Sequence, residues 1–117
     1  MNIAETVLNG MISVVSTAAD SGYIRFYSST PTLLAECRMS AQAFGSPSGG
    51  AIVANAITSS DAVALGNIAS AKLLRSDGAT EIASLTVGVG TGDVRLTRLD
   101  VNVGEPVLVR SLTLSVA

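Results

Sequence analysis

The feature that most limits how this sequence can fold is a two-residue alternation of side chains, which recurs in short runs from residue 22 onward. The run YIRFY at 23–27 places Tyr23, Arg25 and Tyr27 on one side and Ile24 and Phe26 on the other. Successive side chains of a strand point to opposite faces of its sheet, so this pattern is typical of a half-buried strand.

Two further runs show the same alternation. The run LLAECRM at 33–39 predicts a strand that buries Leu33, Ala35, Cys37 and Met39 and turns its charged residues outward. The run VLVRSLTLSV at 107–116 predicts a strand with Leu108, Leu112, Leu114 and Val116 on one face. A last strand this regular would be an aggregation hazard if left open, so we expect it to be paired on at least one side.

Turn signals separate these runs and further strand-like ones. The segment FGSPSGG at 44–50 predicts a loop, SDG at 76–78 predicts the turn of a hairpin between 72 and 87, and GEP at 104–106 predicts a corner. The segments AIVANAIT, VALGNIASAKLLR and VRLTRL predict further strands, the second of them broken near its glycine. About eight short strands indicate an all-β fold, an antiparallel β-sandwich or jelly roll.

The first twenty residues have a different period. Apolar side chains recur at spacings of three and four, which favours a helix with Ile3, Val7, Met11 and either Val14 or Val15 on one face. Against this stand the hairpin-like pair Asn-Gly at 9–10 and several β-branched residues. We expect a helix or arm over 1–20 that docks on a neighbour or on its own sheet, followed by a β-sandwich domain over 21–117.

The residue types needed for most catalytic and metal sites are scarce. The chain has no His and one Cys, which excludes the usual nucleophilic triads and zinc sites and leaves Cys37 as a small buried hydrophobe. Most acidic residues lie in turn-like segments, where turn formation is their ordinary role. The run GVGTGD at 88–93 precedes a strand rather than a helix, so it predicts a turn and not a phosphate loop. We expect no catalytic residues, no cofactor, no metal ion and no enzymatic activity.

The charge content points instead toward protein partners. Charged residues make up 14% of the chain, about half the usual share, and the net charge of −2 leaves no basic stripe for direct nucleic-acid binding. The uncharged stretch near the N-terminus is too short to span a membrane. We therefore expect a surface covered by partner subunits or by copies of the same chain. The candidate interface residues are Ile3, Val7, Met11, Val14, Tyr23 and Tyr27.

The order of these segments resembles a group of small structural proteins of tailed bacteriophages and prophages. The shared pattern is I-R-x-Y-S, T-L-L-A, A-F-G, S-D-G and a close of the form D-x-x-L, G-x-x-V and S-L-T-L, which here spans most of 22–117. The pattern is one of turns and strand faces, and the first segment departs from it most.

The resemblance implies a virion structural protein, most simply a capsid decoration or cement protein. It implies synthesis in the host cytoplasm, a place on the capsid surface, and the major capsid protein or other virion subunits as partners, with self-association into a homo-oligomer. The alternatives are a tail, baseplate or head–tail joining component, and a receptor-binding or carbohydrate-binding module. The lack of Trp weighs against the carbohydrate-binding alternative.

Overall fold

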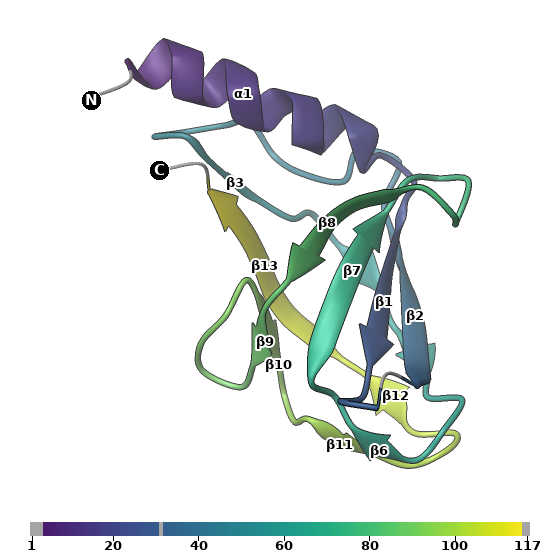
Figure 1. Ribbon diagram of the computed structural model, residues 1–117. Helices are drawn as coiled ribbons and strands as arrows, with labels where there is room; N and C mark the ends of the chain where they lie inside the picture. The colour runs from purple at the N-terminus through teal and green to yellow at the C-terminus, as the bar shows by residue number, and fades with distance from the viewer. Residues whose placement is uncertain (1–3, 31, 116–117) are drawn as a thin grey trace.

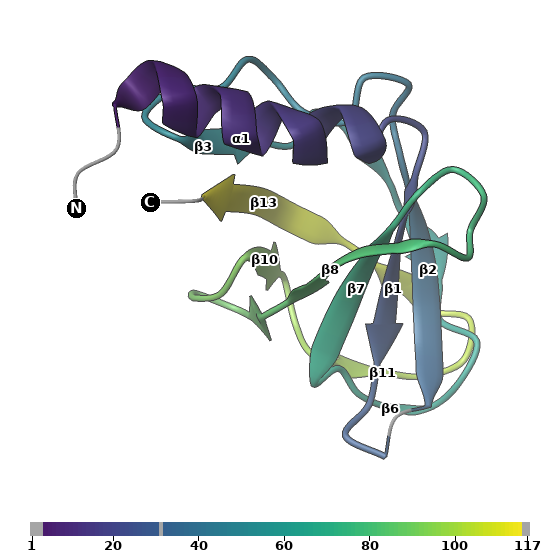
Figure 2. The ribbon, with the colours of Figure 1, turned by 45° about the horizontal axis from the view of Figure 1, so that its top comes forward.

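The computed structural model describes residues 4–30 and 32–115. Two β-sheets pack against each other, and one helix, α1 (Glu5–Ala18), lies across one end of them (Figure 1). Figure 2 shows the same arrangement from a second direction, with the short strands of the opposite end farthest from the helix. The molecule measures 45 × 27 × 22 Å. The predicted all-β sandwich with an N-terminal helix is confirmed.

The larger sheet is antiparallel and has five strands. Its order is β4 (Ile57–Thr58), β2 (Leu33–Met39), β1 (Tyr23–Tyr27), β7 (Ser70–Leu74) and β8 (Glu81–Leu85). The predicted hairpin is β7 and β8, joined by a turn in which Gly78 has a φ of +68°. The central strand β1 pairs on one side with β2, which follows it directly in the chain, and on the other side with β7, which is distant in the sequence.

The smaller sheet has four strands, in the order β3 (Ala51–Val53), β13 (Val109–Ser115), β10 (Val94–Leu96) and β9 (Val87–Gly88). The pair of β9 and β10 is parallel, and the other pairs are antiparallel. The last strand, β13, is therefore paired on both sides, which meets the prediction that at least one side is paired. Two small antiparallel pairs close the end opposite the helix: β11 (Asp100–Val101) with β6 (Gly66–Asn67), and β12 (Pro106–Val107) with β5 (Ser60–Asp61).

A single core of small aliphatic side chains with two phenylalanines fills the space between the sheets. Its fully buried members include Ile24, Phe26, Leu34, Cys37, Phe44, Ile52, Leu73, Val94, Leu96, Val107 and Leu112. The alternation in β1 is as predicted, with Ile24 and Phe26 buried and Tyr23, Arg25 and Tyr27 on the outer face. Within the described residues no polar or charged residue is buried.

The face of α1 that packs against the sheets differs from the apolar face that the spacing of its residues predicts. Ile12 is buried, Val15 packs against the core and Ala19 just beyond the helix is buried, whereas Val7, Met11 and Val14 point outward. The Asn-Gly pair that suggested a hairpin lies within the helix. Packing of one apolar face against the sheets overrides the weak local preference of such residues.

Directly after the helix the chain enters β1 through a close contact at Gly22. A Cβ atom at this position would lie 2.2 Å from the carbonyl oxygen of Leu74 and 2.8 Å from that of Ala19, so the path admits only glycine. This junction fixes where the helix ends relative to the larger sheet.

The predicted inward position of Leu33 is wrong. Phe26 pairs with Ala35 and Tyr27 pairs with Leu33, so the ladder of β1 and β2 skips one residue at a β-bulge. The extra residue, Leu34, is fully buried, while Leu33 is exposed at the start of the strand. A bulge shifts the two-residue register by one position, which exchanges the buried and exposed sides.

The predicted face of the last strand is also wrong at one position. Leu112 and Leu114 are buried as expected, but Leu108 is exposed and its neighbour Val107 is buried in β12. The ladder of β10 and β13 skips Arg110, so a second bulge resets the alternation there. Val116 lies outside the described residues.

The described residues form thirteen short strands rather than about eight, because several predicted strands are each divided and short strands such as β5 lie between them. The segment 51–58 supplies β3 to the smaller sheet and β4 to the larger one, so it crosses between sheets at residues 54–56. The segment 63–75 supplies only β6 and β7, and its first residues form a loop.

Candidate protein interface

The outer face of α1 is an apolar surface open to solvent. Val7, Met11 and Val14 follow one another at spacings of four and three, so they form one stripe along the helix. Their exposed fractions are 52%, 48% and 69%. Gly10 falls in the same stripe by its spacing, and no atom lies within 4 Å of the position a Cβ would take there. We call the surface formed by these four residues the helix face.

The helix face lacks the charges that a solvated helix normally carries. A surface helix usually pairs an apolar inner stripe with a charged outer one. Here the acidic residues Glu5 and Asp20 lie at or beyond the ends, and every residue from 6 to 19 is uncharged. The helix is therefore apolar toward the sheets and largely apolar toward solvent as well.

Contacts with the body hold this helix in place. Besides the burial of Ile12, two of its side chains bind the loop that precedes β3. The backbone N–H of Gly49 donates to Glu5 Oε1 at 3.0 Å, and that of Gly50 donates to Asn9 Oδ1 at 2.8 Å. The helix face is thus presented by an anchored element.

A shallow hollow of about 460 Å³ continues the helix face at the C-terminal end of α1. It is lined by Ser13, Val14, Thr17 and Ala18 from the helix and by Arg75 from the turn after β7. Most of its lining is small or apolar, and Arg75 is the one charged residue in it. The hollow has the shape and chemistry to accept an apolar side chain of a partner with a polar group beside it.

The two predicted tyrosines lie on a second surface, the outer face of the larger sheet. The guanidinium of Arg38 lies 4.9 Å from the centre of the Tyr23 ring, and the ammonium of Lys72 lies 5.6 Å from that of Tyr27. Both rings are therefore partly covered by cations of neighbouring strands.

The turn between β7 and β8 brings one of these tyrosines toward the helix face. Arg75 in this turn lines the hollow beside Val14, and a Cβ on Gly78 would lie 3.6 Å from Cε2 of Tyr23. Tyr27 lies at the other end of β1, roughly 13 Å further along at the usual strand rise. The structure brings Tyr23 but not Tyr27 near the helix face, and Ile3 lies outside the described residues.

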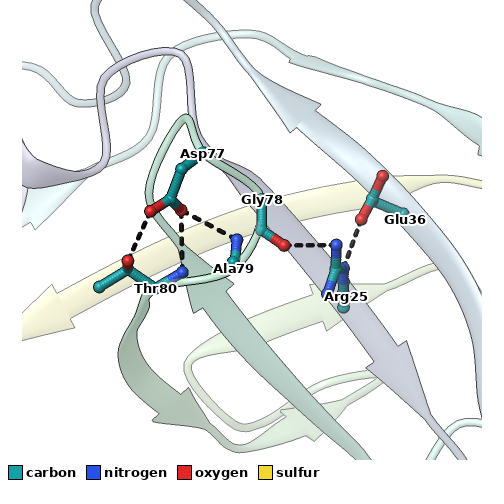
Figure 3. Close-up of polar contacts among 6 residues, drawn as sticks. All are labelled: Arg25, Glu36, Asp77, Gly78, Ala79 and Thr80. Carbon is teal, nitrogen blue, oxygen red and sulfur yellow. Dashed lines mark hydrogen bonds and ion pairs between the residues drawn. The ribbon is translucent and has the colours of Figure 1, made fainter.

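Arg25 fixes the position of that turn. Its guanidinium forms an ion pair with Glu36 on β2 and donates to the carbonyl oxygen of Gly78 at 2.5 Å (Figure 3). The hydrogen bond to Glu36 raises the pKa of Arg25 further above its ordinary value. The turn is therefore tied to the sheet on the side that carries Tyr23.

A second group of exposed apolar side chains lies at the end opposite the helix, where the sequence pattern predicted strands. Leu33, Val63, Leu65 and Val103 are all exposed there. The N–H of Val63 donates to the carbonyl of Leu34 at 2.7 Å, which brings the two segments together. No charge pattern in the sequence marks these residues. Val63, Leu65 and Val103 lie in loops, and Leu33 is exposed at the bulge at the start of β2.

The one cysteine of the chain lies away from both surfaces. Cys37 is buried in β2, and burial raises the pKa of its thiol to about 11. Within residues 4–30 and 32–115, no three Cys, Asp or Glu side chains lie close enough together to hold a metal ion. The features that these two surfaces do present are exposed apolar side chains and aromatic rings beside cations.

Comparison with known proteins yields no relatives. No protein-family model matches the chain, and neither a curated protein nor a solved structure shows significant similarity to it. No helix in the described part of the chain has the length and apolarity that crossing a bilayer requires. The likeness to phage structural proteins stays a prediction from the sequence pattern.

Proposed function

We propose that this chain is a structural protein of a tailed-phage particle, and specifically a decoration protein that stabilises the capsid by contacts with its subunits. The observation that carries this proposal is the uncharged, anchored helix face. An exposed apolar stripe of this kind is stabilised when a partner removes it from water, at about 25 cal/mol per Å² before the cost of association.

The shape of the molecule supports the same proposal. Apolar side chains are exposed at both ends of a body 45 Å long, at the helix face and at the group around Val63. A protein with two such ends can contact two neighbouring subunits at once. In a shell with many equivalent joints, individually weak contacts of this kind add up.

The first test is the composition of the particle. Purified particles made by cells that carry the corresponding phage or prophage are analysed by quantitative mass spectrometry. The proposal expects this chain in a copy number comparable with that of the capsid subunit. A much lower copy number indicates the tail, baseplate or head–tail joint instead, and absence from particles contradicts a structural role in them.

The second test asks whether the helix face makes the contact. Val14→Glu places a charge in the stripe, and Leu108→Glu places the same charge on an exposed apolar residue that belongs to neither group, 47% exposed against 69% for Val14. We expect particles to take up the Leu108 variant and to lose the Val14 variant. Particles that lose the chain should break at a lower temperature. Full uptake of the Val14 variant with unchanged particle stability would contradict the proposal.

A further inference from the structure

A hollow on the smaller sheet gathers two arginines that lie apart in the sequence. Arg95 of β10 and Arg110 of β13 line a depression of about 330 Å³ together with Val89, Gly90 and Ser111. Arg95 pairs directly with Ser111 in the ladder, and Arg110 is the residue that the ladder skips. The bulge therefore determines the direction of the Arg110 side chain.

The bulge explains how an arginine is accommodated at this point of the strand. By plain alternation Arg110 would share a face with Leu108, Leu112 and Leu114, and its guanidinium would point into the core. Because the ladder skips Arg110, its side chain is exposed and lines the same hollow as Arg95. Bulges often re-aim a side chain in this way at functional positions.

Neither arginine has a carboxylate partner in the described part of the chain. Most other cations of the chain have a described partner: Arg25 with Glu36, Lys72 with Glu81, Arg98 with Glu105, and Arg38 over the Tyr23 ring. Among residues 4–30 and 32–115, Arg95 and Arg110 form no ion pair. In a chain with nine acidic residues and seven basic ones, two unpaired neighbours in one hollow stand out.

The nearest carboxylate in the sequence is engaged elsewhere. Asp93 accepts a hydrogen bond from the N–H of Thr86 at 3.1 Å, and its own N–H donates to the Thr86 hydroxyl at 2.9 Å. These bonds close the loop 87–92, one side of which is the Val89–Gly90 rim of the hollow. Asp93 thus shapes the rim and leaves the two guanidinium groups open.

We propose that this hollow binds a carboxylate-bearing segment of another protein. Guanidinium groups present paired N–H donors that match the two oxygens of a carboxylate, and the Ser111 hydroxyl adds a further donor to the lining. The exposed side chain of Val89 offers an apolar contact beside them. An acidic residue with an aliphatic neighbour fits this combination.

The number of charges favours a protein carboxylate over a nucleic acid. A polyphosphate chain is held by a row of cations, and affinity grows with the number of phosphates neutralised. Here two arginines stand together on a protein of net charge −2. That arrangement suits one or two carboxylates. The proposal does not depend on the capsid role, because it concerns the isolated protein and one hollow away from the helix face.

The experiment uses the full chain labelled with ¹⁵N. A tetraglutamate peptide is titrated while the backbone amide signals and the arginine side-chain Nε–H signals are followed by NMR. Tetraglutamine, inorganic phosphate and an oligothymidine are titrated in parallel. The variants are Arg95→Gln with Arg110→Gln, and the matched pair Arg38→Gln with Arg75→Gln, which removes the same charge from other surfaces. Unfolding temperatures show whether each variant is folded.

The expected result is a saturable shift confined to Gly90, Arg95, Arg110 and Ser111 with tetraglutamate and not with tetraglutamine. Loss of both arginines should weaken binding roughly tenfold, at about threefold for each exposed charge pair. The matched pair of variants should bind as the unchanged protein does. Absence of localised shifts, equal weakening by the matched pair, or tighter binding of phosphate or oligothymidine at these residues would each overturn the proposal.

Discussion

Asp77 and Thr80 close the turn between β7 and β8 through two hydrogen bonds. The Asp77 carboxylate accepts one from the backbone N–H of Thr80 at 2.8 Å and one from its hydroxyl at 2.5 Å (Figure 3). The N–H of Ala79 donates a third at 2.9 Å. Because these donors favour the charged form, the pKa of Asp77 falls from 3.8 to about 2.

This turn should make folding stability depend on acid pH. The folded pKa of Asp77 is lower than the unfolded one, so its contribution is present above pH 3.8 and is lost as the pH falls toward 2. We expect Asp77→Asn to lower the unfolding temperature at pH 7 and to differ little from the unchanged protein near pH 2. Circular dichroism melts at both pH values, with Asp61→Asn as the exposed control, check this. An unchanged melt of Asp77→Asn at pH 7 would contradict it.

Two glycines should respond to alanine in opposite directions. Gly78 has a φ of +68°, where an alanine costs about 1–2 kcal/mol. Gly10 lies inside α1 with open space around it, so alanine there should stabilise the protein by about 0.5–1 kcal/mol. Urea unfolding measures both free energies. If both variants changed the free energy of unfolding in the same direction, then either Gly78 would not have a positive φ or Gly10 would not be helical.

The two faces of α1 should differ sharply in their effect on stability. Ile12 is buried, so Ile12→Ala should lower the free energy of unfolding by about 2–4 kcal/mol. Val14 is 69% exposed, and Val14→Ala should change that free energy by less than about 0.5 kcal/mol. Equal losses in chemical denaturation would mean that the helix packs on the sheets by the face we assign to partners.

The Cys37 thiol should be protected in the folded protein. Burial raises its pKa from 9.0 to about 11, so the thiol keeps its proton at neutral pH and is out of reach of reagents. We expect Cys37 of the folded protein to react with a disulfide reagent no faster than local unfolding exposes the thiol, and to react completely in urea. The sign for stability follows: this contribution is complete below pH 9 and is lost as the pH rises toward 11. Rapid labelling of the native protein would show that β2 is accessible.

The sequence predicted those elements whose local signals agree with their long-range packing. The strand β1 alternates strictly, and the hairpin of β7 and β8 has a Gly at its left-handed position, so both were predicted correctly. The division of 51–58 between two sheets was not predictable, because AIVANAIT reads as one continuous run. Which sheet a residue joins depends on partners distant in the chain, and alternation carries no information about them.

The candidate surfaces were predictable to different degrees. The exposed stripe of Val7, Met11 and Val14 follows from helical spacing, although spacing alone did not reveal that Ile12 on another face packs inward. The hollow of Arg95 and Arg110 was missed. Its signal in the sequence is that Arg110 falls on the same face as Leu112 and Leu114 by plain alternation, which would bury a charge. A bulge at Arg110 removes this disagreement. A charged residue at a position where alternation expects a buried apolar side chain therefore indicates a β-bulge.

The bulge in β2 offers a direct test of register with two adjacent leucines. Alternation predicts Leu33 inside and Leu34 outside, whereas the ladder with β1 places Leu34 in the core and leaves Leu33 exposed. Leu34→Ala should therefore lower the free energy of unfolding by about 2–5 kcal/mol, and Leu33→Ala by less than about 0.5 kcal/mol. Because the two variants remove the same atoms from neighbouring positions, urea unfolding of the pair compares burial alone. A larger loss at Leu33 would mean that the strand follows plain alternation and that the bulge is absent.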